Sequence, residues 1–299
     1  MKLRKYAAVD IGSNAIRLLI MHSINYSGGV HYKKVSLVRV PIRLGQDVFT
    51  QGKISERNKD RLVESMNAFK SLIFAHEVDQ YRACATSAMR DASNGEEIAA
   101  LVGKESGINI EVISGKEEAD IIYSTHIENL IDSDRNYLYV DVGGGSTEMT
   151  LFVNGQVEDS RSFNIGTIRL LNDLVSQKEW QTMEQWLKNH HANLDELEAI
   201  GSGGNINRIY KMNLKNNWKP LTKKELIKSR DLIQGMSYEE RLIQLNMNID
   251  RADVVLHATN IFMKVCDWAK IKHIHVPKMG LSDGLVRQMH ERHMALETQ

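Results

Sequence analysis

One pattern occurs twice in the sequence, and this repetition limits the folds that the chain can adopt. Residues 9–20 read VDIGSNAIRLLI, and residues 140–153 read VDVGGGSTEMTLFV. Each copy is an apolar strand ending in aspartate, then a turn of small residues and a second apolar strand. The two aspartates, Asp10 and Asp141, are 131 positions apart. This separation predicts an α/β protein whose two similar domains face each other across a cleft.

The turns have the chemistry of a phosphate cradle. Small residues leave backbone N–H groups accessible, and hydroxyl groups add donors, so such turns bind anions. A third turn of this kind occurs at residues 201–204, ahead of a predicted helix whose N-terminus favours an anion. The predicted phosphate-binding residues of the three turns are Gly12, Ser13, Asn14, Gly143, Gly144, Gly145, Ser146, Gly201, Ser202, Gly203 and Gly204.

The segments after the first two turns argue against the common nucleotide-binding motifs. A P-loop or a dinucleotide fingerprint requires a helix after its glycines. Residues 147–153 instead alternate in a β-rich pattern, and no Gly-Lys-Ser/Thr follows either turn. Each turn is therefore predicted to be the tip of a β-hairpin.

The composition is that of a globular protein without a generic affinity for polyanions. The 299 residues contain 38 basic and 38 acidic side chains, so the formal net charge is zero, which argues against nucleic-acid and membrane-surface partners. With no secretory signal and no apolar run of membrane-spanning length, we expect a cytoplasmic protein. The two cysteines, Cys84 and Cys266, are expected to be buried free thiols. The eleven histidines show no zinc-site spacing.

Hydrophobic periodicity predicts alternating strands and helices in both halves. The first domain is expected at residues 1–125, with the C-terminal helix 282–299 a candidate to complete it, and the second at 126–299. The expected strands are 6–9, 15–22, 30–40, 42–48, 81–85, 108–113, 137–141, 147–153, 156–163, 198–200 and 273–276. The expected helices are 55–76, 96–105, 116–130, 166–175, 178–190 and 282–293, and residues 205–268 are expected to be mostly helical.

Six segments, in order, resemble the motifs of the exopolyphosphatase/guanosine pentaphosphate phosphohydrolase (Ppx/GppA) family. The match runs in order over nearly the whole chain: DIGSNAIR at 10–17, ATSAMRDA at 85–92, EVISGKEEA at 111–119, DVGGGSTE at 141–148, GSGG at 201–204 and RADV at 251–254. The resemblance implies two actin-like (ribonuclease H-like) domains of the sugar kinase–actin superfold, in the short two-domain form of the family. Two places depart from the family pattern, namely Asn205, where threonine is frequent, and residues 277–285.

The resemblance also implies roles for charged residues. The second glutamate of the third motif, Glu118, is expected to be the catalytic base. Arg17 and Arg90 are expected to contact substrate phosphates, although a structural ion pair is the alternative for Arg17. The expected Mg²⁺ ligands are Asp141 and Glu148, and Asp10 is a third candidate with a simple role in closing the hairpin as the alternative.

The sequence thus predicts an Mg²⁺-dependent phosphohydrolase, with Mn²⁺ as a substitute metal. Its expected substrate is inorganic polyphosphate or guanosine pentaphosphate, from which it would release a terminal phosphate. A homodimer is left open. Two other classes remain: an ATP-dependent kinase or ATPase of the same superfold, because similar hairpins would also serve ATP, and a non-catalytic actin-like protein.

Overall fold

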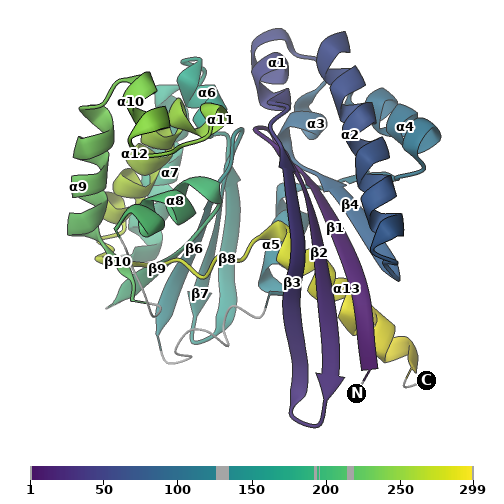
Figure 1. Ribbon diagram of the computed structural model, residues 1–299. Helices are drawn as coiled ribbons and strands as arrows, with labels where there is room; N and C mark the ends of the chain where they lie inside the picture. The colour runs from purple at the N-terminus through teal and green to yellow at the C-terminus, as the bar shows by residue number, and fades with distance from the viewer. Residues whose placement is uncertain (1, 126–134, 192–193, 195, 214–218, 298–299) are drawn as a thin grey trace. The chain divides into compact units, whose positions relative to one another are not determined.

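The computed structural model describes the chain except residues 1, 126–134, 192–193, 195, 214–218 and 298–299. The chain divides into two compact units (Figure 1). The first unit comprises residues 1–125 and 280–299, and the second comprises residues 126–279. In the parts that the structure describes, no helix combines the length and the apolarity needed to cross a bilayer.

The first unit is built on a five-stranded sheet of order β3-β2-β1-β4-β5. The strands β1, β2 and β3 form an antiparallel meander, and β4 and β5 run parallel to β1. The strand bounds are β1 (Lys2–Ile11), β2 (Ile16–Tyr26), β3 (Gly29–Val40), β4 (Gln80–Ala85) and β5 (Ile110–Val112).

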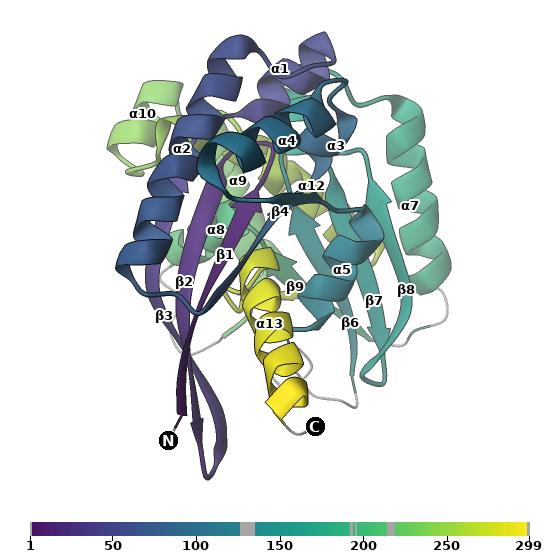
Figure 2. The same ribbon diagram turned by 90° about the vertical axis from the view of Figure 1, so that its right-hand side faces the viewer.

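Helices cover both faces of this sheet (Figure 2). The side chains Leu62, Met66 and Phe69 of α2 pack with α4 on one face. On the other face α13 packs with α5, and Gly284 fits there because an added Cβ would lie 2.0 Å from the carbonyl oxygen of Ile121. The helix bounds are α1 (Leu44–Gln51), α2 (Glu56–Ala75), α3 (Ser87–Asp91), α4 (Gly95–Ser106), α5 (Gly115–Tyr123) and α13 (Leu281–Glu297).

The second unit repeats this arrangement around a six-stranded sheet of order β10-β11-β9-β6-β7-β8. Again three strands form an antiparallel meander, β6-β7-β8, and two further strands, β9 and β11, run parallel to the first of them. The short β10 adds an antiparallel edge. The strand bounds are β6 (Asn136–Val142), β7 (Thr147–Val153), β8 (Gln156–Phe163), β9 (Leu197–Ser202), β10 (Leu221–Thr222) and β11 (His273–His275).

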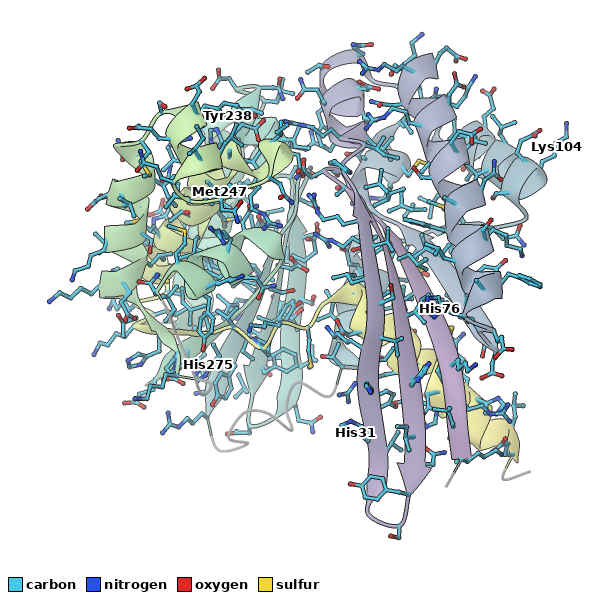
Figure 3. All side chains as sticks on the ribbon, in the orientation of Figure 1. His31, His76, Lys104, Tyr238, Met247 and His275 are labelled. Carbon is cyan, nitrogen blue, oxygen red and sulfur yellow. The ribbon has the colours of Figure 1, made fainter. Side chains whose placement is uncertain are left out.

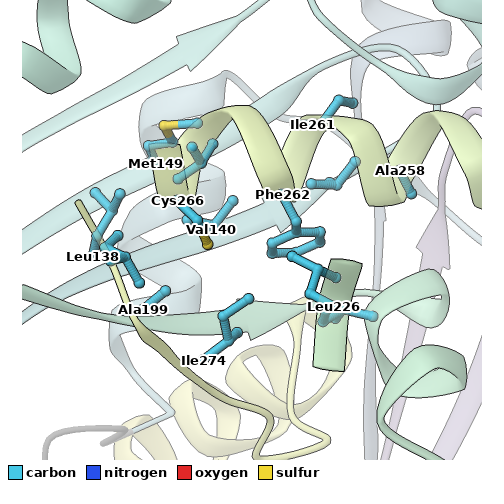
Figure 4. Packing of buried hydrophobic residues seen from close by; sticks show 14 of the residues in the cluster. Leu138, Val140, Met149, Ala199, Leu226, Ala258, Ile261, Phe262, Cys266 and Ile274 are labelled. Carbon is cyan, nitrogen blue, oxygen red and sulfur yellow. The ribbon is translucent and has the colours of Figure 1, made fainter. Parts of the chain in front are cut away.

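The core of the second unit lies between this sheet and its helices (Figure 4). Val140 and Ile274 of the sheet pack with Phe262 and Cys266 of α12 and with Leu226 of α9. The helix bounds are α6 (Thr167–Leu171), α7 (Gln177–His191), α8 (Gly204–Met212), α9 (Lys223–Gln234), α10 (Tyr238–Ile243), α11 (Ile249–Ala252) and α12 (Val255–Trp268).

Most predicted elements are confirmed, with one clear error. Residues 42–48 were expected to be a strand, but α1 occupies Leu44–Gln51. Pro41 lacks the N–H that would continue the sheet, and the buried Leu44 and Val48 are four residues apart, on one face of a helix. The helix expected at 116–130 is confirmed as α5, which ends at Tyr123, and residues 126–130 lie outside the described residues.

Helix α6 is shorter than expected, and α3 and β10 were not predicted. Lys104, in the last turn of α4, is exposed and extends into solvent (Figure 3). Both cysteines are buried free thiols as expected, and burial raises the pKa of each to about 12.

Candidate active site

The first two of the three predicted turns have the same construction. In the first unit the turn 12–15 joins β1 to β2, and in the second unit the turn 143–146 joins β6 to β7. Each is closed by a hydrogen bond from its first N–H to its last carbonyl oxygen, at 3.2 Å from Gly12 to Ala15 and 2.9 Å from Gly143 to Ser146. The sequence repeat is therefore also a structural repeat.

The start of α6 holds the carbonyl groups of the second turn. The carbonyl oxygens of its three glycines, in order, accept from the N–H groups of Thr167 and Ile168 and from Nε of Arg169, at 3.0, 2.8 and 2.8 Å. In a trans peptide the carbonyl and the following N–H point in opposite directions. The next three N–H groups of the turn therefore all point away from α6, which makes a nest for an anion.

Gly166, which precedes α6, permits this contact. An added Cβ there would lie 2.4 Å from the carbonyl oxygen of Gly144 and 2.4 Å from the carbonyl carbon of Gly145. Only a residue without a side chain allows α6 to start this close to the turn. Neither Gly166 nor Arg169 was identified from the sequence.

The start of α1 does the same for the turn of the first unit. Ser13 accepts at its carbonyl from the N–H of Gly45 at 2.8 Å, and Asn14 accepts from the N–H of Arg43 at 3.1 Å. The hydroxyl groups of Ser13 and Ser87 lie 2.8 Å apart, which ties the turn to the start of α3. Ser87 thus also belongs to this site, although no helix is predicted there from the sequence.

Beside the first turn, Arg17 and Asp10 form an ion pair. They face each other across β1 and β2, and Arg17 Nη1 lies 2.9 Å from Asp10 Oδ2. Asp10 is 7% exposed, so its charge needs such a partner. The ion pair considered as the alternative for Arg17 is therefore present, and phosphate contact by Arg17 stays a prediction.

Beside the second turn, two carboxylates take the equivalent positions. Asp141 and Glu148 face each other across β6 and β7, and Ser202 of β9 and Ser162 of β8 lie in the same row. Glu148 Oε1 accepts from the hydroxyls of Ser146 and Ser162, and Asp141 Oδ2 accepts from Ser202 at 3.3 Å. Like charges directly opposite each other on a sheet repel.

A divalent cation would relieve this repulsion, and the oxygen-only donor set fits Mg²⁺. A cluster of three or more acidic, histidine or cysteine ligands does not occur in the described part of the chain. With Asp141 and Glu148 as its protein ligands, such an ion would keep several of its waters, as Mg²⁺ commonly does.

The third predicted turn packs against Asp141. Gly203 has a φ of 99°, which favours glycine, and an added Cβ would lie 3.0 Å from Asp141 Oδ1. Gly201 instead faces the core, because its Cβ would lie 3.0 Å from side-chain atoms of Ile206 and Ile274. Gly201 thus has a packing reason to be glycine, and its predicted phosphate contact is untested.

The structure separates the two adjacent glutamates of α5. Glu117 is exposed and forms a capping box: its carboxylate accepts from the N–H of Ser114 at 2.7 Å, and its own N–H donates to the Ser114 hydroxyl. The hydrogen bond from the Ser114 N–H lowers the pKa of Glu117. Glu118 is only 8% exposed, so the helix cap uses one carboxylate and the other is buried.

Arg90 lies in α3, directly after β4. Its Nη1 donates to the carbonyl oxygen of Ile113 at 2.9 Å, one residue before the cap of α5. Because β1, β4 and β5 are parallel, their carboxyl ends lie along the same edge of the sheet. Asp10 near the end of β1, and the helices α3 and α5 that follow β4 and β5, therefore lie along this edge. The first unit therefore gathers Arg90, Glu118 and the Asp10–Arg17 pair at one edge, the place where open α/β sheets bind ligands.

Two units that each place an antiparallel meander before parallel strands define an actin-like protein, and here each unit carries a hairpin turn of small residues. The chain belongs to the Ppx/GppA phosphatase family, whose model matches residues 23–293.

Solved structures share this fold over the whole chain. An exopolyphosphatase from Cytophaga hutchinsonii is 23% identical with a TM-score of 0.84, and 97% of this chain and 98% of that one are covered. The Ppx/GppA family member of Aquifex aeolicus is 24% identical with a TM-score of 0.77, and 98% and 99% are covered.

Curated relatives match less completely. Exopolyphosphatase 1 of Mycobacterium bovis is 29% identical over 56% of this chain and 48% of its own length. The bifunctional 3-dehydroquinate synthase/phosphatase of Fusobacterium nucleatum is 28% identical over 88% of this chain and 43% of its own length. The chain thus spans about half the length of these curated relatives.

Proposed function

We propose that the protein is a divalent-metal-dependent phosphohydrolase that releases the terminal phosphate of inorganic polyphosphate or guanosine pentaphosphate. The observation that carries this proposal is the turn between β6 and β7. Its three aligned N–H groups suit phosphate oxygens, and the facing carboxylates of Asp141 and Glu148 flank it. Membership of the Ppx/GppA phosphatase family supports the same reaction.

In this proposal Glu118 accepts a proton from the attacking water, because it is the carboxylate that the helix cap does not use. The N–H groups of the glycine turns bind oxygens of the transferred group, and Arg90 stabilises charge on the phosphate chain. When bound at Asp141 and Glu148, Mg²⁺ or Mn²⁺ would supply charge stabilisation to the transferred group.

Asp10 is better suited to another task than metal binding. Its Oδ2 accepts from Arg17 at 2.9 Å, so a metal at this oxygen would compete with a guanidinium. We propose that Asp10 orients Arg17 towards a phosphate. The metal then belongs to the second unit, where the equivalent position holds a glutamate, Glu148.

The test is phosphate release from polyphosphate, guanosine pentaphosphate and ATP by wild-type protein, Glu118→Gln and Glu117→Gln. We expect release from the first two substrates, and a loss of about 10²–10⁴-fold in kcat for Glu118→Gln. Glu117→Gln is the matched control, since glutamine also serves in a capping box and should keep near-normal turnover.

Two results would contradict the proposal. Loss of turnover in Glu117→Gln with normal turnover in Glu118→Gln would show that Glu117, and not Glu118, is the base. Turnover of ATP alone would favour the kinase or ATPase class of the same superfold.

A further inference from the structure

The hydrogen bond from Arg169 to the second glycine turn differs in kind from the contacts beside it. The carbonyls of Gly143 and Gly144 accept from backbone N–H groups, which any residue but proline supplies at 167 and 168. The carbonyl of Gly145 accepts from a side chain, Nε of Arg169, at 2.8 Å. The orientation of this one peptide therefore depends on which residue stands at 169.

That peptide carries the N–H of Ser146, the last of the three that form the nest. Glycine at 145 has wide conformational freedom, so its peptide has little intrinsic preference for one orientation. The equivalent peptide of the first turn, between Asn14 and Ala15, is held differently. There the carbonyl of Asn14 accepts from a backbone N–H, that of Arg43. In the second turn this peptide instead accepts from the side chain of Arg169.

We propose that Arg169 is a positioning residue that orients the peptide between Gly145 and Ser146, so that the Ser146 N–H joins the anion nest. This inference rests on the proposed function for the identity of the anion, a phosphoryl group. It adds that the affinity of the nest for an anion depends on a residue that contacts the carbonyl side of the turn, opposite the N–H groups. A planar guanidinium fixed at Nε suits this task, because it holds its direction better than a flexible ammonium.

The experiment measures inorganic pyrophosphate binding to the full chain by the ¹H–¹⁵N shifts of Gly144, Gly145 and Ser146. We expect Arg169→Gln to weaken binding about tenfold, which corresponds to one lost hydrogen bond of about 1.4 kcal/mol. Arg169→Lys keeps a donor and should recover part of the affinity. Arg241→Gln is the matched control, since Arg241 also donates Nε to a carbonyl, that of Ile233, at 3.0 Å.

A second measurement separates positioning from direct contact with the anion. Residual dipolar couplings of the Gly145 and Ser146 N–H vectors, recorded without any anion, should change in Arg169→Gln and stay unchanged in Arg241→Gln. Unchanged couplings in Arg169→Gln would overturn the proposal even if affinity fell, because Arg169 would then act by touching the ligand.

The remaining outcomes are also decisive. Wild-type affinity in Arg169→Gln, an equal loss in Arg241→Gln, or a wild-type protein whose turn amides do not respond to pyrophosphate would each overturn the inference. If pyrophosphate binding depends on Arg169 but no polyphosphate or guanosine pentaphosphate is hydrolysed, the positioning role stands and the proposed function fails.

Discussion

Gly166→Ala tests the close approach that shapes the second turn. The added Cβ would lie 2.4 Å from the carbonyl oxygen of Gly144 and 2.4 Å from the carbonyl carbon of Gly145. The φ of Gly166 is −132°, which any residue adopts, so the effect is steric alone. Both neighbours are backbone atoms, so either α6 or the turn must move by about 1 Å. Overpacking of this kind costs about 1–3 kcal/mol.

All four tryptophans lie between residues 180 and 268, so tryptophan fluorescence during urea unfolding reports on the second unit. We expect Gly166→Ala to lower its free energy of unfolding by about 1–3 kcal/mol. For a unit of this size the melting temperature should fall by about 2–4 °C per kcal/mol. Because the carbonyls lose their partners when the turn moves, pyrophosphate affinity should fall as well.

The control is Gly235→Ala in the same unit. There the nearest atom to an added Cβ is 3.5 Å away and the φ is −75°, so alanine fits. We expect this change to be neutral or to stabilise by about 0.4–1 kcal/mol through the unfolded chain. Unchanged stability and unchanged pyrophosphate affinity in Gly166→Ala would refute the reasoning, because the turn would then not depend on the start of α6.

Two further predictions concern proton and metal binding. Burial lowers the pKa of His290, whose Nδ1 lies 2.9 Å from Ser23 Oγ, so below about pH 6.5 the unfolded chain takes up a proton that the folded unit does not. The free energy of opening of α13, measured from the hydrogen-exchange protection of its amides, should therefore fall as pH drops from 7 to 5.5. One proton limits this fall to about 1.4 kcal/mol per pH unit. An equal dependence on pH in His290→Gln would contradict the prediction. Glu148→Ala should raise the Mg²⁺ concentration for half-maximal phosphate release, while Glu158→Ala, at an exposed residue of β8, should not. Full activity after exhaustive chelation would exclude the metal role.

The features of the site that the sequence predicted are local ones. A strand, an aspartate and a turn of small residues are adjacent in the chain, so both hairpin tips could be placed at the correct residues. The different roles of Glu117 and Glu118 could also be predicted from the sequence, because a serine three residues before a glutamate, as Ser114 is before Glu117, is the pattern of a capping box.

The features that the sequence did not predict depend on approach in space. Gly166 must be glycine because of Gly144, which is 22 positions away, and Arg169 contacts the carbonyl of Gly145 from 24 positions away. The strand prediction for residues 42–48 was wrong because Ile42 and Leu44 alternate as in a strand, whereas Leu44 and Val48 have the spacing of a helix. That error hid the contact of α1 with the first turn, which is equivalent to the contact of α6 with the second.

The two turns share a construction but differ in charge, and this difference suggests a division of labour. Positions 17 and 148 are related by the same offset of 131 as Asp10 and Asp141, and each faces its aspartate across the hairpin. Arginine at the first position neutralises Asp10, whereas glutamate at the second doubles the negative charge beside Asp141. Under the proposed function, a cation would therefore bind beside Asp141 and Glu148 rather than in the Asp10–Arg17 row. The same construction, with opposite charges at a single position, would thus supply a phosphate-binding half and a metal-binding half.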